Sequence, residues 1–330
     1  MAGVANNQSK GRRAVVLVLQ NLAVAACYYA GGRLGLLKAL VVEGSVVSPI
    51  WPPTGIALAA LLTLGPAVWP GVALGALLVV EYISTPLKPS AIGILAGNTL
   101  APLCAYVLLR AVGFRNELDR LRDGFVLVFL GALVGMLVSA TGGVGQLLFS
   151  RRIHAADFWP VWSAWWTGDA LGVLVVTPVL LVLWRARWPL PFDRWPEALA
   201  LAVSAGFVAP FVATSDLSLL FLVYPLLIWA AVRFQLPGAA LCALFVSVVT
   251  AIAAADGVGP FEDHSQFEVM INLQAFNGSV ALTALLLAAL VTEQRTIRLR
   301  VEQAVTELAE VVEQLAPGWG GGRRRPPREE

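Results

Sequence analysis

Long apolar stretches, separated by short polar segments, follow one another along almost the whole sequence. A helix needs about 20 mostly apolar residues to cross roughly 30 Å of hydrocarbon, and backbone polar groups inside lipid must be paired within helices or closed barrels. The stretches are rich in Leu, Ala, Val and Gly, without the ten-residue alternating segments of an outer-membrane barrel. The sequence therefore predicts an all-α fold, a polytopic transmembrane helical bundle in the lipid bilayer.

The composition agrees with a membrane protein and argues against several other classes. Hydrophobic residues make up 58% of the chain and charged residues 13%, whereas about 25% of the residues of a soluble domain are charged. The formal net charge is only +2, and the basic residues are scattered between the apolar stretches. We therefore expect no nucleic-acid partner, because such a partner requires a concentrated basic surface.

Ten apolar stretches are candidates for membrane spans. The second is too short to cross alone, and Gly65-Pro66 with Trp69-Pro70 breaks the helix between the second and third stretches. We expect about ten spans, or about eight if the second and third form a re-entrant pair. The stretches are 14–32, 54–64, 68–84, 90–109, 124–148, 165–184, 197–213, 217–233, 237–254 and 274–291.

The orientation follows from the basic residues, which concentrate in cytoplasmic segments. Basic residues precede the first stretch, follow the fourth and sixth, and return after the last: Lys10, Arg12, Arg13, Arg110, Arg115, Arg120, Arg122, Arg185, Arg187, Arg194, Arg295, Arg298 and Arg300. Both termini are therefore predicted to be cytoplasmic, and residues 1–13 form a cytoplasmic N-terminal segment. This orientation agrees with an even number of spans.

The chain turns polar after the last span, and a short cytoplasmic C-terminal helix is predicted over 292–316. Its apolar residues recur with spacings of four, three and four at Val301, Val305, Leu308 and Val312. We interpret this stripe as a transmission segment that extends a homodimer formed by the membrane part, since it is shorter than an independent coiled coil. An amphipathic surface helix is the alternative. Residues 317–330 have no apolar period and are expected to be a disordered tail.

No catalytic constellation is evident, and we expect neither an enzyme nor a cofactor. The sequence contains neither a Gly-rich phosphate loop nor a Ser/His/Asp set. Cys27, Cys104 and Cys242 lack the spacing of a metal site, and we expect them to be small buried hydrophobes. His154 and His264 fall in the outer loops, where they are either solvated or able to report pH.

Asp169 is the most conspicuous polar residue in an apolar stretch. It lies in WSAWWTGDALGVLVVTP, where an ionised carboxylate is strongly disfavoured unless it is paired, hydrogen-bonded or reached by water. Helical spacing places Trp162, Trp165 or Trp166, Asp169 and Gly172 along one face. This face indicates either a pocket for a cationic or hydrogen-bonding ligand, or an interfacial tryptophan belt with one hydrogen bond between helices.

Several other polar residues fall in the outer halves of their predicted spans. Asn98 lies about eight residues into the fourth span, and Gln146, Asn272, Gln274 and Asn277 also fall in the outer halves of their spans. We infer a cavity that opens to the outside. Hydrogen bonding between helices is the alternative for any single Asn or Gln.

The second stretch opens with Trp51-Pro52-Pro53-Thr54-Gly55. Two prolines suit a helix start, where the backbone donors are unpaired anyway, and the glycine permits close approach of another helix. Irregular backbone at membrane depth is tolerated only where it is buried in protein or lines a cavity. The spacing alone does not identify a function.

Three separated motifs resemble the signature blocks of the first class of bacterial MASE-type membrane-associated sensor domains. They are SPIWPPTGIALAALLTLGPAVWPGVALGALL (48–78), AGNTLAP (96–102) and WWTGDALGVLVVTPVLL (165–181), in the order of that family. The resemblance covers about 14–291 and implies a sensory input domain in the bacterial inner membrane. In such relatives the domain is typically fused to an output domain through a cytoplasmic helix. The candidate ligand-binding residues combine the polar and aromatic residues above with residues of these motifs: Trp51, Pro52, Pro53, Gly55, Asn98, Trp165, Trp166 and Asp169.

The resemblance leads to the expected function. We predict a sensor in which an unknown small ligand binds in the outer-leaflet cavity and the last span passes the signal to the 292–316 helix. The sequence shows no output domain, so we expect either that the chain acts on an output protein in trans or that an output domain has been lost. A secondary transporter is the main alternative, because broken helices and a buried carboxylate also build transport sites.

Overall fold

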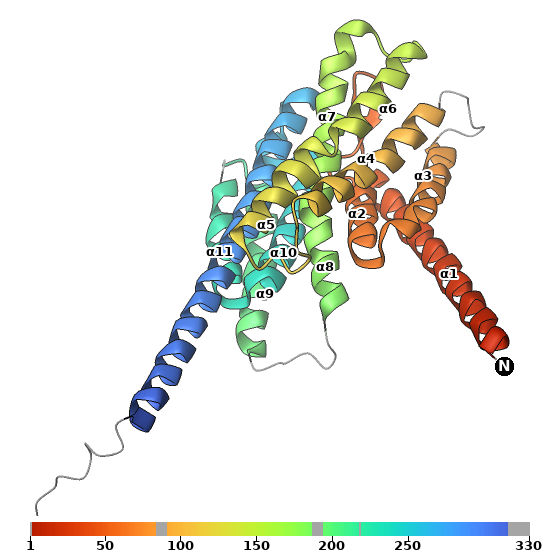
Figure 1. The fold of residues 1–330 in the computed structure, drawn as a ribbon. Coiled ribbons are helices and arrows are strands. Elements are labelled where there is room, and N and C mark those ends of the chain that lie inside the picture. Colours follow the sequence, from red (N-terminus) through yellow and green to blue (C-terminus); the bar gives the residue numbers. More distant parts are fainter. Residues whose placement is uncertain (1, 84–90, 187–193, 218, 316–330) are drawn as a thin grey trace, which may run out of the picture.

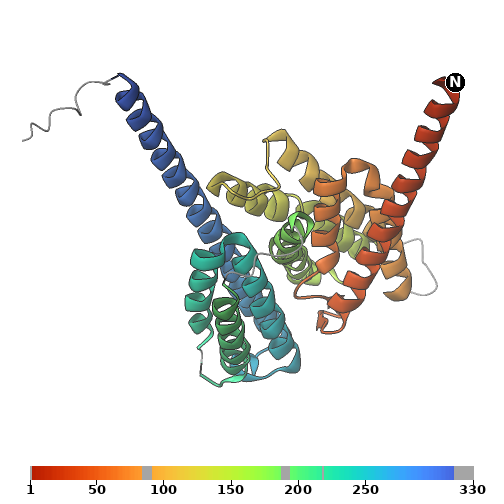
Figure 2. The ribbon, with the colours of Figure 1, turned by 90° about the horizontal axis from the view of Figure 1, so that it is seen from below.

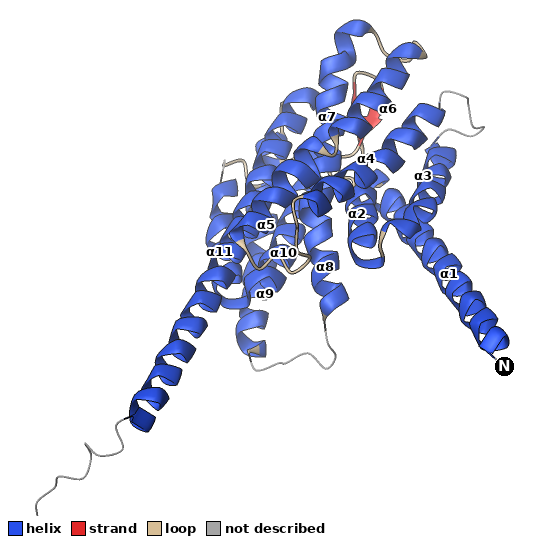
Figure 3. Cartoon of the chain, in the orientation of Figure 1, coloured by secondary structure: helices blue, strands red, loops and turns tan. Residues whose placement is uncertain are grey.

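The computed structural model describes residues 2–83, 91–186, 194–217 and 219–315. Helices account for nearly all of these residues, and the strands are confined to one small hairpin (Figure 3). The first half of the described chain contains α1 Ala2–Leu36, β1 Leu40–Val42, β2 Ser45–Val47, α2 Pro52–Leu64, η1 Pro66–Val68, α3 Trp69–Ile83, α4 Ala91–Ala111, α5 Leu121–Val126, η2 Leu127–Val134 and α6 Leu137–Phe149. The second half contains η3 Ala155–Asp157, α7 Phe158–Leu171, η4 Gly172–Val176, α8 Thr177–Arg185, α9 Trp195–Thr214, η5 Leu220–Val223, α10 Tyr224–Asp256, η6 Gly259–Phe261 and α11 Gln266–Leu315.

Eight helical segments of the described chain are long and apolar enough to cross a membrane. The all-α, multi-pass fold expected from the apolar stretches is therefore confirmed. These segments are Gly11–Leu36, Pro66–Ile83, Ala91–Ala111, Leu121–Phe149, Ala155–Arg185, Trp195–Thr214, Leu220–Asp256 and Gln266–Val312. The short helix α2 adds a further apolar segment.

Helices α2 and α3 correspond to the second and third predicted stretches. Helix α2 has 13 residues, so it is only about 20 Å long. It ends at Gly65, whose φ of 90° is suited to glycine, and Pro66 starts the next turn. Gly71 and Gly75 of α3 then approach Asn21 and Tyr28 of α1, and this close packing holds α3 along α1.

Helix α10 contains the eighth and ninth predicted stretches and is broken between them. Gln235 has a φ of 55° and a ψ of −142°, which no helix tolerates. A Cβ on Gly238 would lie 2.9 Å from the Ala230 carbonyl oxygen, although residues eight apart in a straight helix are about 12 Å apart. The chain therefore folds back at Gln235 into two arms, 224–234 and 236–256, which correspond to the two predicted spans.

The two ends of the described chain project from the same side of the helical body (Figures 1 and 2). Helix α1 begins there, and α11 runs out on that side as one continuous helix of 50 residues, about 75 Å long. We refer to this side as the inner side and to the opposite one as the outer side. The predicted C-terminal helix is thus the direct continuation of the last span.

Candidate functional site

A small cavity lies at the outer ends of α1 and α3, under the β1–β2 hairpin. Its volume is about 80 Å³, enough for several water molecules or a small compound, since one water needs about 10–15 Å³ on the same measure. The lining is apolar apart from a few side chains: Leu36, Val46, Val47, Ser48, Trp51, Val79, Val80, Ile83, Ile94, Asn98, Trp165, Gly168 and Asp169.

Asp169 is the buried carboxyl group of this cavity, and only 1% of the residue is exposed. The Ser139 hydroxyl donates a hydrogen bond of 2.5 Å to its Oδ2 atom, and the Trp165 indole Nε1 donates to the Ser139 Oγ at 3.2 Å. A hydrogen-bonded chain therefore joins α7 to α6 and supports the carboxylate, which reduces the cost of burying it.

Asn98 reaches the same serine from α4. Its Oδ1 lies 3.2 Å from the Ser139 Oγ, but that hydroxyl has a single proton, which the nearer carboxylate accepts. Asn98 is 5% exposed and lines the cavity. Its amide therefore retains hydrogen-bonding capacity toward a molecule in the cavity.

The Trp51-Pro52-Pro53-Thr54-Gly55 segment packs backbone to backbone against α7 and η4. The Trp51 N–H donates to the Gly168 carbonyl oxygen at 2.9 Å, and the Thr54 Oγ1 donates to the Asp169 carbonyl oxygen at 3.1 Å. A Cβ on Gly172 would lie only 1.9 Å from the Trp51 carbonyl oxygen. The glycines of α7 and η4 thus allow the irregular start of α2 to fix the Asp169 segment in place.

The tryptophans of α7 separate into two groups. Trp165 faces the cavity, whereas Trp162 and Trp166 stack on each other with ring centroids 5.6 Å apart. The Trp166 Nε1 donates to the Leu133 carbonyl oxygen at 2.8 Å. Leu133 lies in the π-helical segment η2, where the wider turn makes carbonyl groups available to side chains.

The structure brings together four of the eight predicted ligand-binding residues: Trp51, Asn98, Trp165 and Asp169 line the cavity. The other four do not line it, because they have other neighbours. Gly55 is buried against η4, Pro53 is buried with its backbone near Gly31 of α1, Pro52 lines a separate groove described below, and Trp166 is bonded to η2.

Gln146, Asn272, Gln274 and Asn277 do not line the Asp169 cavity, and Gln274 and Asn277 instead bond between helices, which is the alternative role expected for such residues. Gln274 donates to the Ala164 carbonyl oxygen at 3.2 Å, and Asn277 accepts from Thr250 at 3.0 Å between α10 and α11. Asn272 is exposed, and Gln146 contacts Gly93. Apart from Asn98, these residues act between helices or at the surface.

Two residues next to Asp169 were not predicted as part of the site. Ser139 is a small polar residue in a long apolar stretch, and nothing in its spacing relates it to α7. Tyr28 of α1 is completely buried, lies near Trp51 and Asp169, and has a hydroxyl without a hydrogen-bond partner among the described residues. Adjacent tyrosines at 28 and 29 in an apolar stretch were the available signal for it.

A comparison with protein-family models finds a match to MASE1 over residues 20–295. This range covers most of the chain and includes every element that forms the cavity. The chain belongs to the MASE1 family. MASE1 is a family of membrane-associated sensory domains. Neither the curated proteins nor the solved structures gave a significant match.

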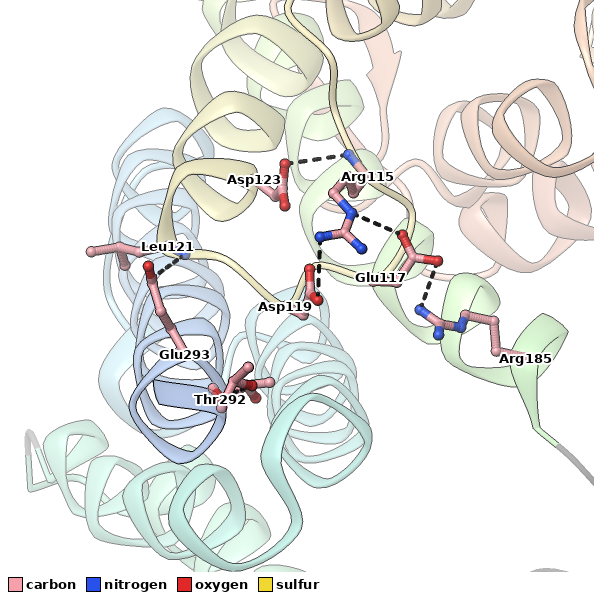
Figure 4. Close-up of polar contacts among 9 residues, drawn as sticks. Arg115, Glu117, Asp119, Leu121, Asp123, Arg185, Thr292 and Glu293 are labelled. Atoms are coloured by element: carbon pink, nitrogen blue, oxygen red, sulfur yellow. Dashed lines mark hydrogen bonds and ion pairs between the residues drawn. The ribbon is translucent and has the colours of Figure 1, made fainter. Parts of the chain in front are cut away.

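The MASE1 domain links its cavity to α11 through α7. Gln274 of α11 donates to the carbonyl oxygen of Ala164, which lies one residue before Trp165 and five before Asp169. The short loop between α4 and α5 then contacts α11 near the inner side. There the Glu293 carboxylate accepts a 3.0 Å hydrogen bond from the Leu121 N–H at the start of α5 (Figure 4).

A charged network surrounds this inner contact of the MASE1 domain. Arg115 lies 3.7 Å from both Glu117 and Asp119, and Glu117 also pairs with Arg185 of α8 at 3.3 Å (Figure 4). Asp123 accepts from the Arg115 N–H at 3.2 Å. The α4–α5 loop thereby connects α8 to the point at which α11 leaves the helical body.

The three cysteines are not all buried, although all three were expected to be. Cys242 is buried as expected, and Cys104 is half-buried, but Cys27 is exposed on α1. Within the described residues no three His, Cys, Asp or Glu side chains gather closely enough to hold a metal ion.

Proposed function

We propose that this MASE1 domain binds a small cationic or hydrogen-bonding compound in the Asp169 cavity and passes the signal to α11. The buried Asp169 carboxylate carries the proposal, because a charge at that position is expensive in a membrane protein unless it has a function or a partner. Ser139 supports one of its oxygens, and the cavity lies beside it.

The chemistry of the lining indicates the class of ligand. Trp51 and Trp165 provide aromatic rings, Asp169 provides negative charge, and Asn98 provides an amide. Indole rings and a carboxylate together attract a cation, and ammonium groups are recognised in this way in other aromatic pockets. With a volume of about 80 Å³ the cavity suits a small amine or a compound of similar size.

The proposed signal travels by a shift between two packing arrangements of the helices. A ligand changes this equilibrium only if it binds one arrangement better than the other. Helix α7 carries Asp169 and Trp165 and is bonded to α11 through Ala164 and Gln274. A shift of α7 upon binding would therefore displace α11, whose inner part is a single continuous helix.

We place the domain in the bacterial inner membrane with both termini in the cytoplasm. The basic residues that flank the spans support this orientation, as does the projection of α1 and α11 from one side. The output would then be an effector in trans or a segment fused to α11.

The exposed side of α11 is the proposed contact for a second copy. Val301, Val305, Leu308 and Val312 are 57–64% exposed on the projecting part of the helix. Two such stripes would bury each other in a parallel pair. A homodimer would thereby place two signalling helices side by side.

Thermal unfolding of the purified protein in detergent, measured across a library of small amines and neutral metabolites, tests the binding site. A ligand raises the apparent stability of the native state by mass action, and we expect at least one amine to stabilise the wild type and to lose its effect on Asp169→Asn. Asp123→Asn is the matched control, because it makes the same change in a carboxylate that is 3% exposed at the inner side. A compound that stabilises both variants equally would contradict the assignment of the site.

Uptake into proteoliposomes distinguishes the proposed sensor from a transporter. Transport sites of secondary transporters lie near the midplane, between repeated halves, whereas this cavity is bounded by the outer hairpin and the outer ends of α1 and α3. We expect the stabilising compound to bind without accumulating inside the vesicles. Accumulation that is abolished by Asp169→Asn would favour a transporter instead.

A further inference from the structure

A second and much larger hollow lies on the side of the bundle formed by α1, α2, α8 and α10. We call it the α1–α10 groove. Its volume is about 940 Å³, and α8, its floor, lies between α2 and α10 (Figure 1). Residues from the candidate spans that contain α1, α8 and α10, and from the short helix α2, supply most of the lining, which is almost entirely apolar.

The direction of the groove follows from its α1 residues. The lining on this helix begins at Ala23 and continues to Gly35, and Leu37 and Lys38 follow just beyond the outer end of the helix. The interval from Ala23 to Gly35 corresponds to about 18 Å of helix, which is longer than one leaflet, since half of the hydrocarbon core is about 15 Å. The groove therefore extends along α1 from its outer end over at least the depth of one leaflet.

The lining of the groove indicates a hydrocarbon occupant. Nearly all of its side chains are apolar, and the groove lies on helices that cross the membrane, where acyl chains are the surrounding medium. Thin and flexible hydrocarbon chains can follow such an apolar hollow over its length.

Charged groups stand at the outer end of the groove. Lys38 lines it and forms an ion pair with Asp256 at the end of α10, which connects the two walls. Both side chains are partly exposed, at 42% and 48%. A phospholipid headgroup matches this arrangement, because its phosphate suits the lysine and the ammonium of a zwitterionic lipid suits the aspartate.

We propose that the α1–α10 groove is a binding site for one phospholipid of the outer leaflet. The acyl chains occupy the apolar groove, and the headgroup phosphate lies at Lys38. Ser48 lines both this groove and the Asp169 cavity, so the lipid is separated from the cavity by the segment that leads into α2. The proposal does not depend on the identity of the ligand in the cavity.

Native mass spectrometry of the protein released from nanodiscs of phosphatidylethanolamine and phosphatidylglycerol tests this site. We expect one phospholipid to remain bound to the wild type. Ala30→Phe places a ring in the groove and should lower the lipid occupancy about tenfold, equivalent to about 1.4 kcal/mol. Ala26→Phe is the matched control, because Ala26 is also exposed on α1 but does not line the groove.

Two more variants ensure that the test does not depend on the folding of a single variant. One places a second ring in the groove, and the other removes the charge at its outer end. Ala60→Phe fills the groove from α2 and should have the same effect as Ala30→Phe. Lys38→Gln should weaken retention of both lipids, since both carry the phosphate. A wild type that retains no lipid, or equal retention in Ala26→Phe and both filled variants, would overturn the proposal. Replacement of the lipid by a second copy of the chain would also overturn it.

Discussion

Glycine residues determine how closely the Asp169 segment packs, and this close packing gives the first prediction. Gly172→Ala should lower the thermal unfolding temperature, because its Cβ would lie 1.9 Å from the Trp51 carbonyl oxygen. Overpacking of this kind typically costs about 1–3 kcal/mol. Gly206→Ala in α9 is the control, since its Cβ would meet no atom within 4 Å. Equal unfolding temperatures for the two variants would contradict the described contact.

Trp165 and Trp166 are neighbours in sequence with different roles, and conservative variants should separate these roles. Trp166→Phe removes the hydrogen bond to the Leu133 carbonyl oxygen and should cost about 1–3 kcal/mol of stability, while the response to a stabilising amine is retained. Trp165→Phe changes the cavity lining and should weaken that response. Both effects can be measured as ligand-dependent shifts of the unfolding temperature. If Trp166→Phe weakened the ligand response and Trp165→Phe left it unchanged, the cavity could not lie on the Trp165 face of α7.

At the scale of single residues, the sequence indicated Asp169, Asn98 and Trp165 because polar and aromatic residues are unusual in apolar stretches, and Trp51 because it belongs to a motif of the family. It could not predict Ser139 or Tyr28 as neighbours of Asp169. Their contacts join α6 and α1 to α7 across long separations in sequence, and those pairings depend on how the helices pack.

At the scale of secondary-structure elements, the contact between α11 and the start of α5 gives a prediction for hydrogen exchange. Glu293→Ala removes the acceptor for the Leu121 N–H, so this amide should exchange its hydrogen several-fold faster. Hydrogen exchange of peptides that cover 115–125 measures the effect. Glu302→Ala is the control on the same helix, because Glu302 pairs only with Arg298 among the described residues. Unchanged exchange in Glu293→Ala would show that the loop is not held by α11.

The exposed apolar stripe of α11 gives a second prediction at this scale, which concerns the pairing of two α11 helices. In membranes, Leu308→Cys in a background without the three native cysteines should form intermolecular disulfide bonds, since Leu308 is 64% exposed on the stripe. Glu307→Cys is the neighbouring control outside the stripe. Equal crosslinking at both positions would be inconsistent with a parallel pair of α11 helices.

Element boundaries were predicted well where glycine and proline break a helix, and less well elsewhere. Gly65-Pro66 correctly separated α2 from α3, and the gap between the eighth and ninth stretches coincides with the break at Gln235. The π-helical segments η2 and η4 left no signal in the sequence. A wider turn depends on neighbours such as the Trp166 side chain, which bonds the Leu133 carbonyl oxygen.

For the whole molecule, the central claim is that the cavity at the outer side is coupled to α11 at the inner side. The described contacts provide a continuous route, from Asp169 and Trp165 through the Ala164–Gln274 hydrogen bond to the part of α11 that carries Glu293. The sequence predicted both ends of this route. It could not predict the connection, because hydrogen bonding between helices was considered for Gln274 but nothing in the sequence pairs this residue with Ala164.

The distance between spin labels on α11 and on the helical body is the most direct test of this coupling. Gln303→Cys on the projecting helix and Ala111→Cys at the end of α4 provide exposed positions, in a background without native cysteines. Pulsed electron paramagnetic resonance in nanodiscs, with labelled protein diluted by unlabelled protein, gives the distance distribution. We predict that Asp169→Asn shifts the distribution relative to the protein with an intact cavity, and that the control Asp123→Asn does not reproduce the same shift. Identical distributions with and without the Asp169→Asn substitution would contradict the coupling.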